Sequence, residues 1–185
     1  MSRKEKSRLI RRRIYDATYQ LVREKGLDYT VTDVCRRSGV SVGSFYHFYK
    51  SKEAVAQDIY IFFDEHMEGF LQSLTGSCEE KIENALCEAV SYSSSLGVQF
   101  LQLSINSIAS HDGAVVHVES PLFTFLCKTI RESGYSLEEK PDYYARFLIT
   151  LFRGTLNWWT VNGGVFDIEK RMRSYVRTAL RGMFN

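Results

Sequence analysis

The chain has 185 residues, of which 44% are hydrophobic and 25% are charged, so it can form a packed core. No apolar run approaches the ~18 residues of a membrane-spanning helix, and no apolar signal segment follows the basic N-terminus. We therefore expect a cytoplasmic protein without a membrane partner. The four cysteines lie far apart with no C-x-x-C pair, which is typical of buried thiols in a reducing compartment.

The charge is unevenly distributed along the chain. Residues 1–52 contain thirteen Lys or Arg against five Asp or Glu, whereas residues 53–185 contain eleven against seventeen. The net charge of +2 thus combines a basic first part with an acidic remainder. This asymmetry indicates that the first part meets a polyanion.

Apolar residues recur every three or four positions over most of the chain, which predicts an all-α protein. The first helix should end at Gly26. Thr30 can cap a short helix that Gly39 ends, and Ser41 can cap a second short helix over about 42–48. Ser51 should then cap one long helix that carries apolar residues as far as residue 74.

Further helices are expected after Gly76. Their approximate ranges are 79–95, 97–109, 120–132, 143–162 and 168–183. The helix at 143–162 is apolar around much of its circumference, which the core of a single small domain rarely covers on all sides.

The stretch "GVSVGSFYHFYKSK", which begins at Gly39, combines small residues, four aromatic rings and two lysines. Two short helices joined by a turn that contains glycine form a helix-turn-helix unit. In DNA-binding versions the second helix enters the major groove with its N-terminus first. Small residues at that end let the backbone approach base edges and phosphates. An aromatic cluster alone would be typical of ordinary core.

The longer stretch "TVTDVCRRSGVSVGSFYHFYKSKEAV" resembles the DNA-binding domain of the TetR family of bacterial transcriptional repressors. The shared features are the threonine before the first short helix, the G-V-S turn, the tyrosine of the recognition helix and the K-x-K-E run. The resemblance implies a three-helix DNA-binding domain over 7–67, with its helix-turn-helix at about 30–49. Residues 68–185 would then form a helical domain for ligand binding and dimerisation.

The resemblance also implies roles for single residues. Thr30, Tyr46 and Lys52 match phosphate-contact positions, and Lys50 can reach a phosphate as well. Two positions depart from the usual pattern: Val42 stands where a polar residue is common and could contact a thymine methyl, and Tyr49 replaces the usual phenylalanine, so its hydroxyl must find water or a phosphate. The predicted DNA contacts are Thr30, Thr32, Ser41, Val42, Gly43, Ser44, Tyr46, His47, Tyr49, Lys50 and Lys52.

The remainder of the chain, by the same resemblance, senses a small molecule and forms a homodimer. The apolar helix at 143–162 supports a dimer independently, although both it and the last helix could simply be internal. Aromatic and flexible side chains crowd this part, which favours an apolar or aromatic effector, and each of them could equally be plain core. The predicted effector contacts are Phe63, His66, Met67, Phe70, Tyr92, Phe100, Phe147, Asn157 and Trp158.

The function expected from these features is a ligand-responsive repressor that binds a palindromic operator as a dimer and is released by a small effector. The alternatives are a DNA-binding activator and a co-regulator that contacts a protein instead of a metabolite. The sequence contains no G-x-S-x-G, H-E-x-x-H, P-loop or dinucleotide motif, so we do not expect an enzyme. We predict neither a cofactor nor a metal site.

Overall fold

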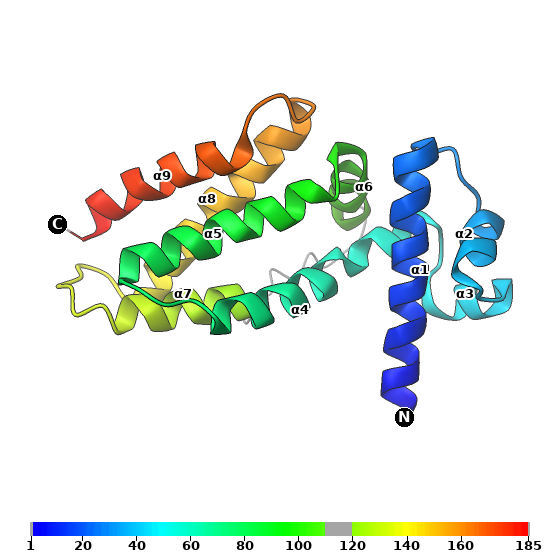
Figure 1. Cartoon of the computed structure of the whole chain (residues 1–185), viewed down its shortest axis with the longest axis horizontal. Helices are drawn as coiled ribbons and strands as arrows, with labels where there is room; N and C mark the ends of the chain where they lie inside the picture. The colour runs from blue at the N-terminus through cyan, green and yellow to red at the C-terminus, as the bar shows by residue number, and fades with distance from the viewer. Residues whose placement is uncertain (1, 110–119, 185) are drawn as a thin grey trace. The chain divides into compact units, whose positions relative to one another are not determined.

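The computed structural model describes residues 2–109 and 120–184. Within these ranges the chain is all-α, as predicted, with no strand. Figure 1 labels the helices in chain order. They are α1 (Arg3–Lys25), α2 (Val31–Ser38), α3 (Val42–Phe48), the 3₁₀ helix η1 (Glu53–Asp58), α4 (Ile59–Gln72), α5 (Cys78–Ser95), α6 (Val98–Ala109), α7 (Pro121–Arg131), α8 (Pro141–Val161) and α9 (Ile168–Met183).

The described residues form two compact units. The first contains the chain up to Tyr60 together with α6, and the second contains most of α4 with α5, α7, α8 and α9. The units therefore divide at Tyr60, and the first includes a helix from the middle of the chain. The functional boundary that we placed at residue 67 remains a prediction.

The first unit is built on α1, which packs against α2, η1 and α6. A capping box between Ser2 and Glu5 begins α1, and Gly26 ends it at a φ of 63°. Phe100 of α6 is fully buried, and its ring meets those of Tyr15 and Tyr19 edge-on, at 5.3 and 5.6 Å between centroids. The core of this unit therefore joins residues 80 or more positions apart in the sequence.

The segment after Ser51 differs from its prediction. Ser51 accepts a hydrogen bond from the backbone N–H of Ala54 (3.3 Å), but the first six residues form η1 before α4 begins. A 3₁₀ helix places residues three apart on the same face. Val55 and Asp58 are both buried on that face. The tighter winding thus directs an acidic side chain into the interior beside an apolar one.

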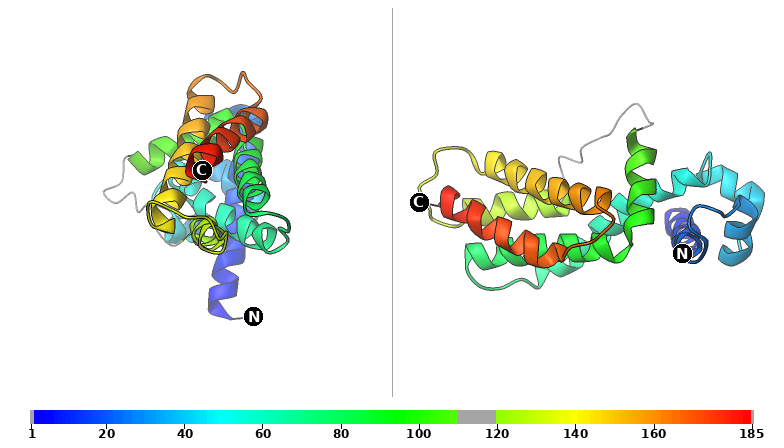
Figure 2. Two further views of the ribbon diagram at one scale, coloured as in Figure 1. Left: turned by 90° about the vertical axis from the view of Figure 1, so that its left-hand side faces the viewer. Right: turned by 90° about the horizontal axis from the view of Figure 1, so that it is seen from above.

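The second unit packs α5 against α9 and α7 against α8, and Figure 2 shows these helices from two further sides. Its core is almost entirely apolar, with Leu86, Leu126, Leu148 and Met172 fully buried. Residue Glu83 of α5 adds an ion pair to Arg177 of α9 (2.7 Å) and another to Arg173.

Candidate nucleic-acid interface

Helices α2 and α3 both begin at a side-chain cap, and a glycine ends α2. The Thr30 hydroxyl accepts a hydrogen bond from the Asp33 N–H (3.1 Å), and the Asp33 carboxylate accepts one from the Thr30 N–H (3.0 Å). Gly39 ends α2 in the left-handed region, at φ 64° and ψ 33°. Ser41 then caps α3 by accepting a hydrogen bond from the Ser44 N–H (3.2 Å). Both helix starts and the glycine turn lie where the sequence predicts them.

Helix α3 has one buried face and one exposed face. Phe45 is fully buried, whereas Val42 and Tyr46 are 47% and 55% exposed. His47 is exposed as well, and its ring meets Phe48 edge-on. Small and aromatic side chains on the outer face can approach a groove without first displacing packed neighbours.

Eight of the eleven predicted DNA contacts have exposed side chains or backbone. Ser44 and Lys52 are half-buried, and Tyr49 is buried. The exposed residues among them are Thr30, Thr32, Ser41, Val42, Gly43, Tyr46, His47 and Lys50. Their contacts with DNA remain predictions.

The hydroxyl of Tyr49 does not follow its prediction. Its side chain is 5% exposed, and its hydroxyl donates to the Asp58 carboxylate, so the expectation that it meets water or a phosphate is wrong. Burial is the main reason that the pKa of Tyr49 is raised, and the bond to Asp58 raises it further. A hydroxyl at this buried position needs an acceptor, and η1 provides one 9 residues later.

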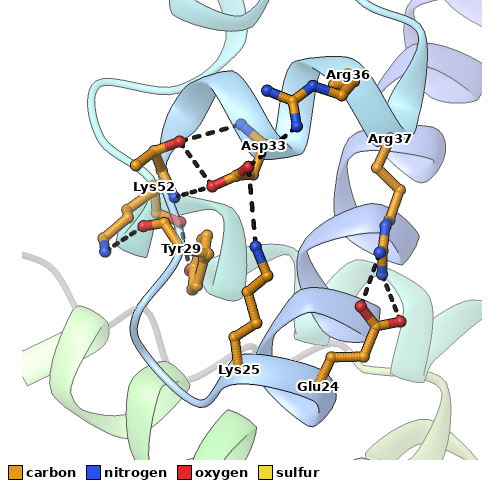
Figure 3. A network of polar contacts seen from close by, with 8 residues as sticks. Glu24, Lys25, Tyr29, Asp33, Arg36, Arg37 and Lys52 are labelled. Carbon is orange, nitrogen blue, oxygen red and sulfur yellow. Dashed lines mark hydrogen bonds and ion pairs between the residues drawn. The ribbon is translucent and has the colours of Figure 1, made fainter.

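Lys52 already has protein partners. Its ammonium donates to the carbonyls of Leu27 (3.0 Å) and Tyr29 (2.6 Å), and it lies 4.6 Å from the centroid of the Tyr29 ring. Figure 3 shows Lys52 beside Tyr29. This lysine holds the turn between α1 and α2, and its predicted phosphate contact would be additional to that role.

The arginine run at 11–13 has structural partners that the sequence did not indicate. Arg11 pairs with Asp58, and Arg12 pairs with Asp16 (3.0 Å). Arg13 donates to the carbonyls of Ser38 (2.5 Å) and Gly39 (3.2 Å). A Cβ at Gly39 would lie 2.7 Å from the end of the flexible Arg13 side chain, which would have to shift, and the φ of 64° is the feature that favours glycine here. The partners of Arg11 and Arg13 are 47 and 25 residues away, which local pattern reasoning does not reach, whereas Arg12 and Asp16 have the i,i+4 spacing of neighbours on one helix face.

Ion pairs also surround the start of α2, as Figure 3 shows. Asp33 lies 3.9 Å from Lys25 and 3.7 Å from Arg36, and Arg37 lies 2.7 Å from Glu24. Hydrogen bonds from Thr30 lower the pKa of Asp33, and the bond from Arg37 lowers that of Glu24. These carboxylates offset part of the positive charge, so the net charge near α2 is smaller than the arginine count implies.

The predicted effector contacts separate into four groups. His66 stacks on Tyr92 (4.3 Å between centroids) and forms a 2.6 Å hydrogen bond with Glu88, while Phe63 lies 6.0 Å from the Tyr92 ring. Met67 and Phe70 belong to the apolar core of the same unit.

The remaining effector candidates lie elsewhere. Phe100 lies in the core of the first unit, where its ring meets that of Tyr15. Phe147, Asn157 and Trp158 are exposed on α8. The structure adds one residue that the prediction lacked, Phe152, which stacks on Phe63 at 5.8 Å. Among the predicted effector contacts, Phe63, His66 and Tyr92 are the ones whose rings lie against one another.

No helix in residues 2–109 or 120–184 has the length and apolar character needed to cross a membrane. In the same ranges no three His, Cys, Asp or Glu side chains converge in a way that could hold a metal ion.

Comparison with known proteins gives matches of two kinds. Residues 14–59 match the model of the "bacterial regulatory proteins, tetR family". Over 192 aligned residues, the chain is 22% identical to the HTH-type transcriptional repressor KstR2 of Rhodococcus jostii (strain RHA1), covering 94% of this chain and 90% of that protein.

Solved structures share the fold. The Thermus thermophilus transcriptional repressor FadR, in complex with lauroyl-CoA, superposes with a TM-score of 0.73 at 21% identity, covering 95% of each chain. The fatty acid degradation regulator FadR from Bacillus halodurans gives 0.63 at 16% identity, covering 93% of this chain and 98% of that one. Both likenesses extend over nearly the whole length, so they include the helices that follow the helix-turn-helix.

Proposed function

Because residues 14–59 match the model of the tetR family of bacterial regulatory proteins, and nearly the whole chain is similar to a transcriptional repressor, we propose that this protein is a DNA-binding regulator that represses transcription as an effector-responsive homodimer. The observation that carries this proposal is the exposed outer face of α3, from Val42 to His47, held on a capped helix-turn-helix. Two such helices, one from each protomer, would enter consecutive major grooves of a palindromic operator about 34 Å apart.

The dimer is supported by α8. Tyr143, Phe147, Trp158 and Val161 are 57%, 46%, 45% and 72% exposed, and their spacing places them on one face of the helix. Gly154 lies on the same face, and a Cβ there would meet nothing within 4 Å. An apolar stripe with a glycine at its middle suits the close approach of a second helix, so we propose that α8 packs against its counterpart in the partner.

The effector site is proposed at His66, Tyr92 and Phe63. The aromatic rings of these three residues lie together beside the apolar core, and one of the rings is the ionisable imidazole of His66. Apolar walls with a few polar groups are typical of small-molecule sites. Since one structural neighbour was solved with lauroyl-CoA and another is named for fatty acid degradation, a long-chain acyl thioester is the first effector to test.

Release would follow from unequal binding to two conformations of the dimer. The chain passes from the first unit to the second through α4, which begins directly after Asp58. A ligand that binds the non-DNA-binding conformation ~5–150-fold more tightly supplies the 1–3 kcal/mol of coupling typical of such switches. We expect a larger separation of the two recognition helices when the effector is bound.

The test is selection of bound sequences from a pool of random duplexes by the purified full chain. The expected product is a two-fold symmetric site whose halves are about one helical turn apart. Dodecanoyl-CoA should then release the selected duplex, whereas free coenzyme A should not. Enrichment of no sequence would contradict the repressor, and a symmetric site that no acyl-CoA releases would favour a regulator controlled by another effector or by a protein.

A further inference from the structure

The recognition helix is too short to set its own direction. It has seven residues, and isolated helices shorter than about 12 residues are marginal in water. Its orientation therefore depends on the contacts that hold it. Phe45, fully buried near its middle, is the apolar contact, and the question is what prevents rotation about this point.

The polar contact lies at the C-terminal end of α3. The hydroxyl of Tyr49 donates to Asp58, whose side chain is only 4% exposed. Arg11 Nε donates to the same Asp58 oxygen at 2.9 Å, and Arg11 Nη2 donates to the other oxygen. One buried carboxylate thus joins α1, the end of α3 and the end of η1.

This arrangement uses both oxygens of Asp58. A buried carboxylate is costly unless charge and hydrogen bonds compensate for its lost hydration. Arg11 supplies the charge, and its guanidinium carbon also lies 5.7 Å from the centroid of the Tyr49 ring. The pair is complete without Tyr49, so the hydroxyl is an added constraint on α3 and is not needed to neutralise Asp58.

The position of Tyr49 on α3 determines how a movement there would change the orientation of the recognition helix. Tyr49 follows Phe45 by four residues, roughly 6 Å along the helix at 1.5 Å per residue. A displacement of about 1 Å at Tyr49 would rotate α3 by roughly 10° about Phe45. Val42, on the other side of Phe45, would then move by nearly 1 Å in the opposite direction. The donor–acceptor distance of a hydrogen bond to a base edge can vary by only a few tenths of an ångström. Such a displacement would therefore weaken the discrimination between bases, while phosphate contacts would persist.

We infer that the Tyr49 hydroxyl is a positioning group for sequence recognition: by its bond to Asp58 it fixes α3 and sets how well the protein separates its operator from other duplexes. The inference rests on the proposed DNA-binding function and deepens it. Asp58 is also the last residue before α4. A displacement of the first turn of α4 would therefore act on the end of the recognition helix through the bond between Asp58 and Tyr49.

The experiment compares Tyr49→Phe with the unaltered protein on the selected operator and on a scrambled duplex of the same composition. The expected result is a loss of about three- to tenfold in the ratio of the two affinities, since one net hydrogen bond contributes about that much. Scrambled-duplex affinity and the salt dependence should not change, because no phosphate contact is removed. A purely structural role would lower the melting temperature and leave the affinity ratio unchanged.

Tyr29→Phe is the matched control. Tyr29 is a buried tyrosine of the same unit, 3% exposed, and its hydroxyl has only a 3.5 Å contact with the Lys52 carbonyl. It should leave the affinity ratio unchanged. An equal loss in Tyr29→Phe and Tyr49→Phe would overturn the inference, because the effect would then belong to any buried hydroxyl.

A second variant tests the acceptor. In an Asp58→Leu background the Tyr49 hydroxyl has no carboxylate to bind, so adding Tyr49→Phe should cause no further loss of the ratio. Additive losses would overturn the inference. If the unaltered protein is selective and Tyr49→Phe equals it, only this inference fails; if the unaltered protein is not selective, the proposed function fails and the inference with it.

Discussion

The helix-turn-helix and the second unit are stabilised in different ways. Helices α2 and α3 have eight and seven residues, and caps, a left-handed glycine and arginine contacts to carbonyls define their ends. Helices α5 and α8 have 18 and 21 residues and bury a continuous apolar core with few polar contacts. In the first region single contacts fix a geometry, whereas in the second the stability is distributed over many contacts.

The largest expected effect comes from the single apolar anchor of α3. Phe45→Ala should destabilise the first unit by about 3–5 kcal/mol, as truncation of a buried phenylalanine typically does, and should abolish selective DNA binding. Urea unfolding and fluorescence anisotropy would measure the two effects.

Leu148→Ala provides the comparison in the second unit. Leu148 is also fully buried, and its truncation should cost about 2–5 kcal/mol. At temperatures where this variant stays folded, its operator selectivity should equal that of the unaltered protein. If Leu148→Ala lost as much selectivity as Phe45→Ala, the two regions would not differ in how strongly single contacts determine DNA recognition.

The next effect concerns the exposed face of α8. Phe147→Glu places a charge on the stripe that we propose to be buried in the dimer, and it should weaken dimerisation more than tenfold because an unpaired charge is costly to bury. Sedimentation velocity over a concentration series would measure the dissociation. Ile105→Glu, a similar change at an exposed residue of α6, is the control. A dimer of unchanged affinity in Phe147→Glu would place the interface elsewhere.

A smaller effect separates two roles within α3. Tyr46→Ala should weaken binding to all duplexes by about tenfold, since a phosphate contact carries no sequence information. Ser44→Ala should instead change the preference between operator variants at one or two base pairs. Binding to a panel of single-base operator variants would distinguish them, and parallel profiles for both substitutions would show that the assigned roles are incorrect.

The smallest effect lies in the ion pairs of the second unit. The hydrogen bond from Arg177, with a further one from Arg173, lowers the pKa of Glu83 below its ordinary value of 4.5. The charged form therefore adds stability above about pH 4.5, and this stability is lost as the pH falls through the lowered pKa. Glu83→Gln should reduce the melting temperature by about 2–4 °C near neutral pH, and the difference should shrink in acid. A constant difference across this range would argue against an electrostatic cause.

The sequence predicted features that depend on neighbouring residues. Thr30, Gly39 and Ser41 each act within a few residues, so the bounds of α2 and α3 followed from their types alone. The resemblance to a known DNA-binding domain assigned Tyr46 to an outward position, and its side chain is exposed. These are the features that place the candidate interface.

Features that depend on distant partners were not predictable. The acceptor of the Tyr49 hydroxyl is an aspartate in a 3₁₀ turn, and no local pattern distinguishes that aspartate from a solvated one. Phe100 was assigned to an effector site because it is aromatic, yet α6 packs against α1 and its ring meets Tyr15 and Tyr19. Composition identifies aromatic side chains, but only tertiary packing decides which of them converge.

The most direct test of the central claim is a salt titration of binding to the selected operator and to a scrambled duplex. The logarithm of the affinity should fall steeply and linearly with the logarithm of salt concentration for both duplexes. We expect a preference for the operator of about 10³ or more, with two protomers or a multiple of two bound per site. Weak binding of equal strength to both duplexes would contradict the assignment of α3 as a recognition helix.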